Sequence, residues 1–242
     1  GRTLSVSQFL LILLIFKSMT KLIYMEHMNI YSYKSTIEDI KEIDGKTIIV
    51  LNETIFYPQG GGQPYDTGTI KNNNTVFQVE EVRYVDGQVY HIGTYESGSL
   101  NIGDSVELFI DQEKRILHTK LHSIGHLVDM ALKELSIDWI PGKGYHFPNG
   151  PYVEYVGNLD GFNKEQLIKD LENKCNEIIN RNIETRLTFE NNTLKNGKPQ
   201  RIVYYGDFSI PCGGTHVANL GDIGTVIIRK IKQEKENIRI SY

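Results

Sequence analysis

The hydrophobic pattern changes character near residue 110. From about residue 21 to that point, short runs of β-branched and aromatic residues alternate with turn signals such as Asp44-Gly45 and Asp86-Gly87. Short strands at this regular spacing predict a small β-barrel. The clearest strand-like runs are residues 47–51, 76–82, 88–92 and 105–110.

A helical pattern follows in residues 112–135, and Asp111 stands where a capping side chain is expected. His122 and His126 lie on the side of this helix opposite its apolar stripe. We therefore expect the stripe, and not the two histidines, to be the most deeply buried face. The stripe consists of Leu117, Leu121, Ile124, Val128, Ala131 and Leu135.

The rest of the chain predicts an α+β fold with an antiparallel sheet. A glycine- and proline-rich hairpin is expected in residues 142–157, and Asn163 can cap a second helix that runs to about Asn180. Strands are expected near residues 185–190, 201–205, 225–231 and 238–242. We divide the chain into a barrel domain, residues 19–111, and a second domain, residues 112–242.

The first eighteen residues stand apart from this organisation. Residues 9–16 are an apolar run with the length of a signal-peptide core, which is too short to span a membrane. No small-residue cleavage site follows, and the chain starts with Gly1. We expect residues 1–18 to be extraneous sequence upstream of a start at Met19, with a targeting segment as the alternative.

Composition excludes several classes of protein. A formal net charge of −4 over 242 residues argues against a broadly basic protein that coats nucleic acid, although it leaves room for a local basic groove. Two cysteines, Cys175 and Cys212, provide no disulfide framework, which favours a reducing compartment and a cytoplasmic location.

Two pairs of residues predict a metal site. His122 and His126 are four apart on a helix, and Cys212 and His216 have the same spacing on a glycine-rich loop. Thiolate and imidazole ligands favour Zn²⁺, one ion per chain, held between opposite walls of one pocket. Ser123 stands where a zincin protease needs its glutamate, which disfavours that chemistry. Four protein ligands suit a structural zinc, so a catalytic role is not settled by the ligand count.

Two glycine-rich stretches add candidate contacts. The run FYPQGGGQP, residues 56–64, lacks the pattern of a phosphate loop or a dinucleotide fingerprint, and a tight turn at a barrel rim explains it equally well. In residues 142–148, Lys143 suits a phosphate, and Tyr145 or Phe147 could stack on an unpaired base. A packed aromatic hairpin with a solvated lysine is the equal alternative.

Four blocks together resemble a known family. They are FYPQGGGQPYDTG (56–68), HSIGHLVDMAL (122–132), GKGYHFPNGPYVEY (142–155) and CGGTHVANLGDIG (212–224). In order and spacing they resemble the medium-length AlaX proteins, freestanding relatives of the editing domain of alanyl-tRNA synthetase. The resemblance covers about residues 19–242. It implies a barrel of the translation-protein type, followed by the α+β editing domain shared by threonyl- and alanyl-tRNA synthetases.

The resemblance also implies an activity. It implies zinc held by His122, His126, Cys212 and His216, and hydrolysis of tRNA(Ala) mischarged with serine or, less favoured, glycine. No membrane and no stable protein partner is expected, and ATP binding is left open. We expect substrate contacts from residues of the four blocks, namely Gln63, Gly125, Lys143, Tyr145, His146 and Thr215.

Two points stay open at this stage. The synthetase commonly has a threonine before the second histidine, where this chain has Gly125, so serine selectivity does not simply carry over. The general base is not identified: water activated by zinc, a ribose hydroxyl of the tRNA, His118 and His146 are all open. The alternatives to the deacylase are a non-catalytic, zinc-stabilised tRNA-binding module and a deacylase of another aminoacyl-tRNA.

Overall fold

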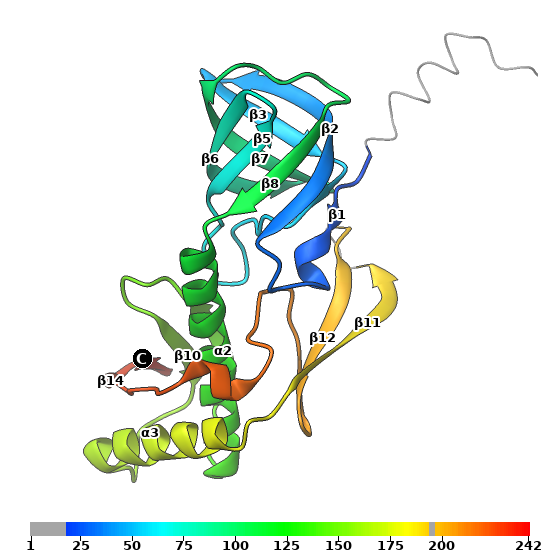
Figure 1. Ribbon diagram of the computed structural model, residues 1–242. Coiled ribbons are helices and arrows are strands. Elements are labelled where there is room, and N and C mark those ends of the chain that lie inside the picture. The colour runs from blue at the N-terminus through cyan, green and yellow to red at the C-terminus, as the bar shows by residue number, and fades with distance from the viewer. Residues whose placement is uncertain (1–17, 194–196) are drawn as a thin grey trace, which may run out of the picture.

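The computed structural model describes residues 18–193 and 197–242, so nearly all of the segment 1–18 lies outside the described residues. Two separate hydrophobic cores are present, one built from residues 22–110 and the other from residues 127–242. Figure 1 shows the barrel at one end of the molecule and the α+β part at the other, with the long helix α2 leading from one to the other. The predicted fold class is confirmed.

The barrel is closed by six antiparallel strands in the order β2-β3-β7-β6-β5-β8. Closure satisfies the backbone hydrogen bonds that a sheet edge would leave free. The four strand-like runs of the sequence are β3, β6, β7 and β8, while β2 and β5 were not singled out. The bounds are β2 Ser32–Ile43, β3 Lys46–Leu51, β5 Gly68–Asn72, β6 Thr75–Val85, β7 Gln88–Ser97 and β8 Ser105–Ile110.

A short N-terminal segment packs beneath the barrel. Strand β1, Lys21–Leu22, pairs in parallel with β4, Glu53–Thr54, and a 3-10 helix, η1, follows at Ile23–Met25. All three residues of η1 are buried and belong to the barrel core. The segment therefore fills the space where the barrel meets the second half.

Helix α2 spans Gln112–Glu134, and the Asp111 side chain accepts a hydrogen bond from the backbone N–H of Lys114, as predicted. The prediction about its buried face is wrong in the first half of the helix. Leu117 is 44% exposed, whereas the opposite, polar face carrying His118 and His122 is buried. The barrel and the Cys212 loop cover this face. Its polar side chains tolerate burial because Arg115 pairs with Asp66 and His122 belongs to the cluster of candidate ligands.

The second half holds α3 and two antiparallel sheets, ordered β14-β15-β10-β9 and β11-β12-β13. Helix α3, Lys164–Asn180, begins after the predicted cap Asn163 and packs against α2. The bounds are β9 Ile140–Tyr145, β10 Tyr152–Val156, β11 Thr185–Thr193, β12 Pro199–Tyr205, β13 Phe208–Pro211, η2 Leu220–Ile223, β14 Lys230–Glu234 and β15 Asn237–Ser241.

One predicted strand is displaced. The run 225–231 was expected to be a strand, but β14 begins only at Lys230. The backbone N–H groups of Val226 and Ile228 bind the side chains of Asn176 and Glu172 on α3. Because helix side chains take the donors that a sheet partner would need, the apolar run packs on α3 without joining the sheet.

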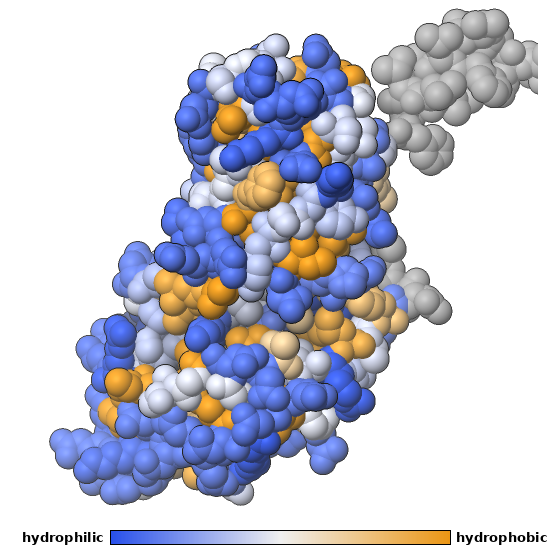
Figure 2. Space-filling view, viewed as in Figure 1, coloured by the Kyte–Doolittle hydropathy of each residue, from blue (hydrophilic) through white to orange (hydrophobic). Residues whose placement is uncertain are grey.

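On the face shown in Figure 2, hydrophobic side chains reach the surface in separate patches among hydrophilic ones, which is ordinary for a folded protein. Of the helices in residues 18–193 and 197–242, none combines the length and the apolar composition that crossing a bilayer requires.

A buried ion pair joins the barrel to α2. The Arg115 side chain is fully buried and donates to both carboxylate oxygens of Asp66 and to the backbone carbonyls of Met28 and Ile55. The Asp66 carboxylate also accepts from the backbone N–H of Tyr57 at 2.7 Å. One guanidinium thus holds the start of α2, the N-terminal segment and the loop before β5 together.

Replacing Asp66 by Asn should destabilise the fold by about 3–5 kcal/mol, because it leaves the Arg115 charge buried without its counterion. Urea unfolding measures the loss. The exposed pair Lys46–Glu80 on the barrel surface is the matched control, and Glu80→Gln should leave the unfolding midpoint nearly unchanged. Equal midpoints for Asp66→Asn and the unaltered protein would contradict this account of the domain junction.

Candidate metal centre and its cavity

The structure brings the two predicted ligand pairs together. The loop that follows β13 carries Cys212 and His216 onto the flank of α2 that holds His122 and His126. One ligand atom from each of the four residues lies within 4.8 Å of the other three. Residues 90 positions apart in sequence therefore form one cluster.

The cluster fits a tetrahedral cation. Zinc–sulfur and zinc–nitrogen bond lengths place tetrahedral ligand atoms about 3.3–3.7 Å apart. The Cys212 Sγ lies 3.4 Å from His122 Nε2 and 3.2 Å from His216 Nε2. The Nε2 atom of His126 is buried and has no hydrogen-bond partner among the described residues, which a bound cation would supply.

The protonation of the donors also suits a cation. Burial alone would raise the pKa of the Cys212 thiol, but His122 and His216 beside it hold that pKa well below its ordinary value. Burial disfavours a charged His126, yet Asp129 and Cys212 raise its pKa to about 9. The same negative groups that attract a proton to this point would attract a metal ion, so the residues can hold one.

The side-chain amide of Gln63 orients His122. The Thr215 backbone N–H donates to Gln63 Oε1 at 3.0 Å, which identifies that atom as the acceptor. The same oxygen lies 2.8 Å from His122 Nδ1, so Nδ1 carries the proton and donates. Because Nδ1 is used by Gln63, Nε2 is the ring nitrogen that faces the Cys212 sulfur and is available to a metal. A residue of the barrel half thus positions a metal ligand of the other half.

Asp129 has the equivalent position beside His126. Its Oδ2 lies 3.5 Å from His126 Nδ1, and its other oxygen accepts from the Tyr155 hydroxyl at 2.5 Å. Tyr155, on strand β10, thereby orients the Asp129 carboxylate, and the carboxylate in turn orients the His126 imidazole. Sequence spacing could have suggested Asp129, because it lies one helical turn beyond His126.

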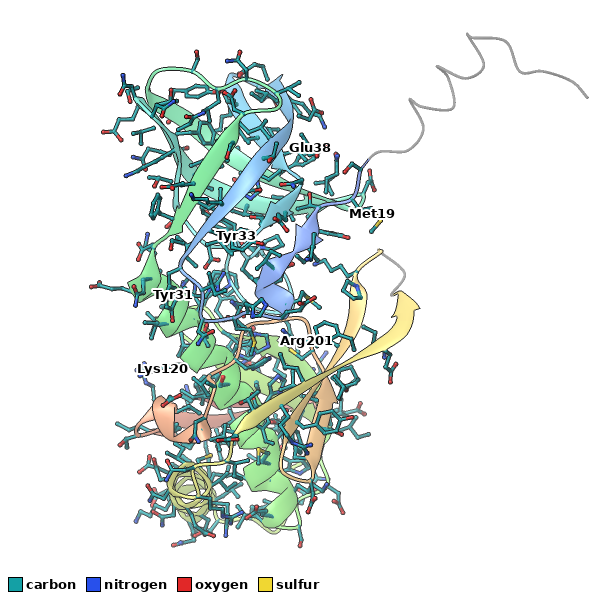
Figure 3. All side chains as sticks on the ribbon, turned by 45° about the vertical axis from the view of Figure 1, so that its right-hand side comes forward. Met19, Tyr31, Tyr33, Glu38, Lys120 and Arg201 are labelled. Carbon is teal, nitrogen blue, oxygen red and sulfur yellow. The ribbon has the colours of Figure 1, made fainter. Side chains whose placement is uncertain are left out.

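A second buried arginine shapes the Cys212 loop. Arg201 on β12 donates to the backbone carbonyls of Cys212, Gly214 and Met25, and it is only 2% exposed. Figure 3 shows Arg201 at the waist of the molecule, between the barrel and the sheet that contains β12. Its charge lies near the Cys212 thiolate, and its donors hold the loop against η1.

A cavity of about 380 Å³ opens beside three of the four ligands, His122, His126 and Cys212. The motif residues Gly60 and Gly61 form one side, the β9 hairpin with Lys143 and His146 forms another, and Lys198 lies at the rim. The His146 ring stacks on His122 with centroids 4.4 Å apart. Burial and the neighbouring His122 and His126 lower the pKa of His146 to about 2, so this imidazole is neutral.

The predicted contact residues divide into two groups. Gly125, Lys143 and His146 line the cavity, whereas Gln63 and Thr215 lie behind the ligands and hydrogen-bond to each other. Tyr145 stacks between Phe147 and Tyr152, outside the cavity lining.

The positions of one histidine and one lysine bear on the sequence predictions. His118, one of the candidates for the general base, is 6% exposed and does not line the cavity. Lys198 does line the cavity, although no motif marked it in the sequence. Lys198 immediately precedes strand β12. Its ammonium lies 4.2 Å from the centroid of the Tyr84 ring.

Comparisons with known families agree with this architecture. Residues 15–114 match the family of class II (A) tRNA synthetases, and residues 200–241 match the threonyl and alanyl tRNA synthetase second additional domain. The second match contains Cys212 and His216, and the first contains the glycine-rich motif with Gln63.

Individual relatives extend the match over most of the chain. The alanyl-tRNA editing protein AlaX-M of Pyrococcus horikoshii is 33% identical over 222 residues, which cover 89% of this chain and 92% of that protein. AlaX-L of the same organism is 30% identical over 235 residues, covering 93% of this chain but 58% of its own length. An alanine–tRNA ligase of Clostridioides difficile is 32% identical over 195 residues, 22% of the ligase. The chain belongs to the AlaX family of alanyl-tRNA editing proteins.

Proposed function

We propose that this chain is a trans-acting deacylase that hydrolyses tRNA(Ala) mischarged with serine and, less readily, with glycine. One observation carries the proposal: a 380 Å³ cavity lined by three of the four convergent metal ligands, in a member of the alanyl-tRNA editing family. A cavity of this size suits the acylated end of a tRNA. We propose zinc as the metal, because thiolate and imidazole donors in a tetrahedron favour it over magnesium or calcium.

The reaction needs little besides a positioned water. Water oxygen bonds to the ester carbonyl carbon, the bond from that carbon to the ribose oxygen breaks, and the ribose oxygen takes up a proton. Among the described residues that line the cavity there is no serine or threonine, and the Cys212 thiol is a candidate metal ligand, which favours direct attack by water. When bound, zinc supplies a positive charge that can stabilise the developing oxyanion.

The protein residues set the geometry of this step. Gln63 and Asp129 hold His122 and His126 in fixed orientations. The motif backbone at Gly61 lies close to the cluster, since a Cβ built there would be 4.0 Å from His122 Cε1. Without side chains, this wall lets an extended substrate backbone come near the metal ligands.

Two lysines at the rim suit the tRNA phosphates. Lys143 belongs to β9, Lys198 immediately precedes β12, and both line the cavity. Burial removes water from the Lys198 ammonium and thereby lowers its pKa, and a bound phosphate would favour the charged form. We propose that both bind phosphates of the terminal nucleotides, which would place the ester over the metal centre.

One prediction of this proposal concerns the substrate. The metal-loaded protein should deacylate Ser-tRNA(Ala) at least about tenfold faster than Ala-tRNA(Ala), with a chelator abolishing the activity and Zn²⁺ restoring it. Charged tRNA remaining over time measures the rates, with Gly-tRNA(Ala) and other charged tRNAs in the same panel. Loss of every ester at the rate seen without protein would refute the proposal. Hydrolysis confined to another aminoacyl-tRNA would redirect it to that substrate.

The rival function is a non-catalytic, zinc-stabilised tRNA-binding module, favoured by the four protein ligands that fill a tetrahedron. Cys212→Ala separates the two. The deacylase predicts a folded variant that has lost metal and activity, whereas the rival predicts unfolding of the α+β part. Circular dichroism and metal analysis give the readout. Cys175→Ala is the control, because this buried thiol belongs to the core and should leave one metal per chain.

The rim lysines give a further prediction. Lys143→Ala and Lys198→Ala should each raise KM for the tRNA several-fold with little change in kcat, and should lower the salt dependence of kcat/KM by about 0.7–1 in log–log slope. Lys174→Ala on α3 is the control, since Lys174 pairs with Glu177 and does not line the cavity. A change in kcat alone would mean that the lysines do not bind phosphates.

A further inference from the structure

The His146 imidazole occupies a slot made by three glycines. A Cβ built on Gly125 would lie 2.5 Å from its Cε1, one on Gly144 would lie 2.6 Å from its Nε2, and one on Gly62 would lie 3.2 Å from its Cδ2. The backbone N–H of His146 also donates to the Gly62 carbonyl at 2.8 Å. A side chain at position 125 and the ring of His146 therefore compete for the same space.

The hydrogen bonds of the ring fix which nitrogen carries the proton. The Tyr242 hydroxyl donates to the Leu121 carbonyl at 3.0 Å, which uses its one proton. It therefore accepts from His146 Nδ1, 2.5 Å away. The other nitrogen, Nε2, is left with a lone pair that can only accept.

Within residues 18–193 and 197–242, the hydrogen bond of the His146 ring is the one from Nδ1 to Tyr242, which leaves the Nε2 lone pair without a donor. Nε2 is not among the buried side-chain atoms that are sealed from solvent without a partner. His146 is 4% exposed overall, and what remains open faces the cavity that its ring lines. A buried, oriented acceptor of this kind is expected to receive a donor from whatever fills the cavity.

We propose that His146 determines substrate specificity, with its Nε2 accepting a hydrogen bond from the side-chain hydroxyl of the aminoacyl group. This inference rests on the proposed deacylase function. Gly125 has no side chain to line the cavity or to contact the substrate. The His146 ring fills that space and offers Nε2 as the polar contact. An alanyl ester leaves Nε2 desolvated and unpaired, so the site discriminates against it.

Matched variants test the contact. His146→Ala should reduce the preference for Ser-tRNA(Ala) over Ala-tRNA(Ala) about tenfold, mainly through the serine ester. His146→Gln can place an amide oxygen near the position of Nε2 and should keep part of the preference. His146→Asn reaches only toward Tyr242 and should lose it. Exposed His27→Ala serves as the control, and metal analysis verifies that each variant retains its ion.

The packing is tested without any activity. Gly125 is inside α2, where alanine favours a helix over glycine. Gly125→Ala should therefore raise the melting temperature in the His146→Ala background, where the slot is empty, but lower it in the wild type, where the Cβ meets the ring. The same sign of shift in both backgrounds would overturn the proposed competition for space.

The outcomes are distinguishable. Wild-type protein that hydrolyses none of the esters overturns the proposed function and the specificity assignment with it. Wild-type protein that prefers the serine ester, with an unchanged preference in His146→Ala, overturns the role of His146 alone. An equal loss for all esters means that Nε2 contacts a group they share, such as the α-ammonium, and also overturns that role. A selective loss for serine, reproduced by His146→Asn, supports it.

Discussion

The orientation of the metal centre depends on one buried amide, the side chain of Gln63. All four candidate ligands belong to the α+β half, but the tautomer of His122 is set by an oxygen from the barrel half. The backbone N–H of Thr215 donates to that atom of Gln63. Because a backbone N–H can only donate, the atom must be the amide oxygen, which accepts. The Gln63 oxygen thus accepts from the ligand loop, at Thr215, and from helix α2, at His122. The glycines before Gln63 allow the motif to approach closely enough to make both contacts.

Two buried guanidinium groups maintain this arrangement. Arg115 and Arg201 come from different elements, and each donates to a carbonyl of the N-terminal segment, at Met28 and Met25 respectively. A guanidinium has five donors in a plane, so burying one requires acceptors from several segments at once. Separating the two halves would leave these donors unsatisfied, which is costly inside a protein. The cavity walls are therefore held at a fixed spacing.

Much of this architecture is encoded locally and could be predicted. The caps Asp111 and Asn163, four of the six barrel strands and the two ligand pairs follow from short-range patterns. The buried face of α2 could not be predicted, because periodicity assumes that burial is apolar, whereas here the buried side carries His122 and its neighbours. The strand expected at residues 225–231 failed for a similar reason, since α3 side chains took its backbone donors.

The partners of the site residues are also beyond sequence reasoning. Gln63 meets Thr215 across 152 positions, and His146 meets Tyr242 across 96. Such contacts depend on how the halves dock and not on any spacing within a motif. The relation between Gly125 and His146 is of this kind, because a glycine in a helix has no visible purpose until the ring beside it is seen.

The position of Gln63 ties the cohesion of the molecule to its metal. Docking of the barrel favours the His122 tautomer whose lone pair faces the ion, so it strengthens metal binding. Coupling between two equilibria is reciprocal, and a bound ion must therefore favour the docked barrel by the same free energy. The barrel contributes none of the four candidate ligands, yet a higher concentration of free metal would stabilise its docking to the α+β half.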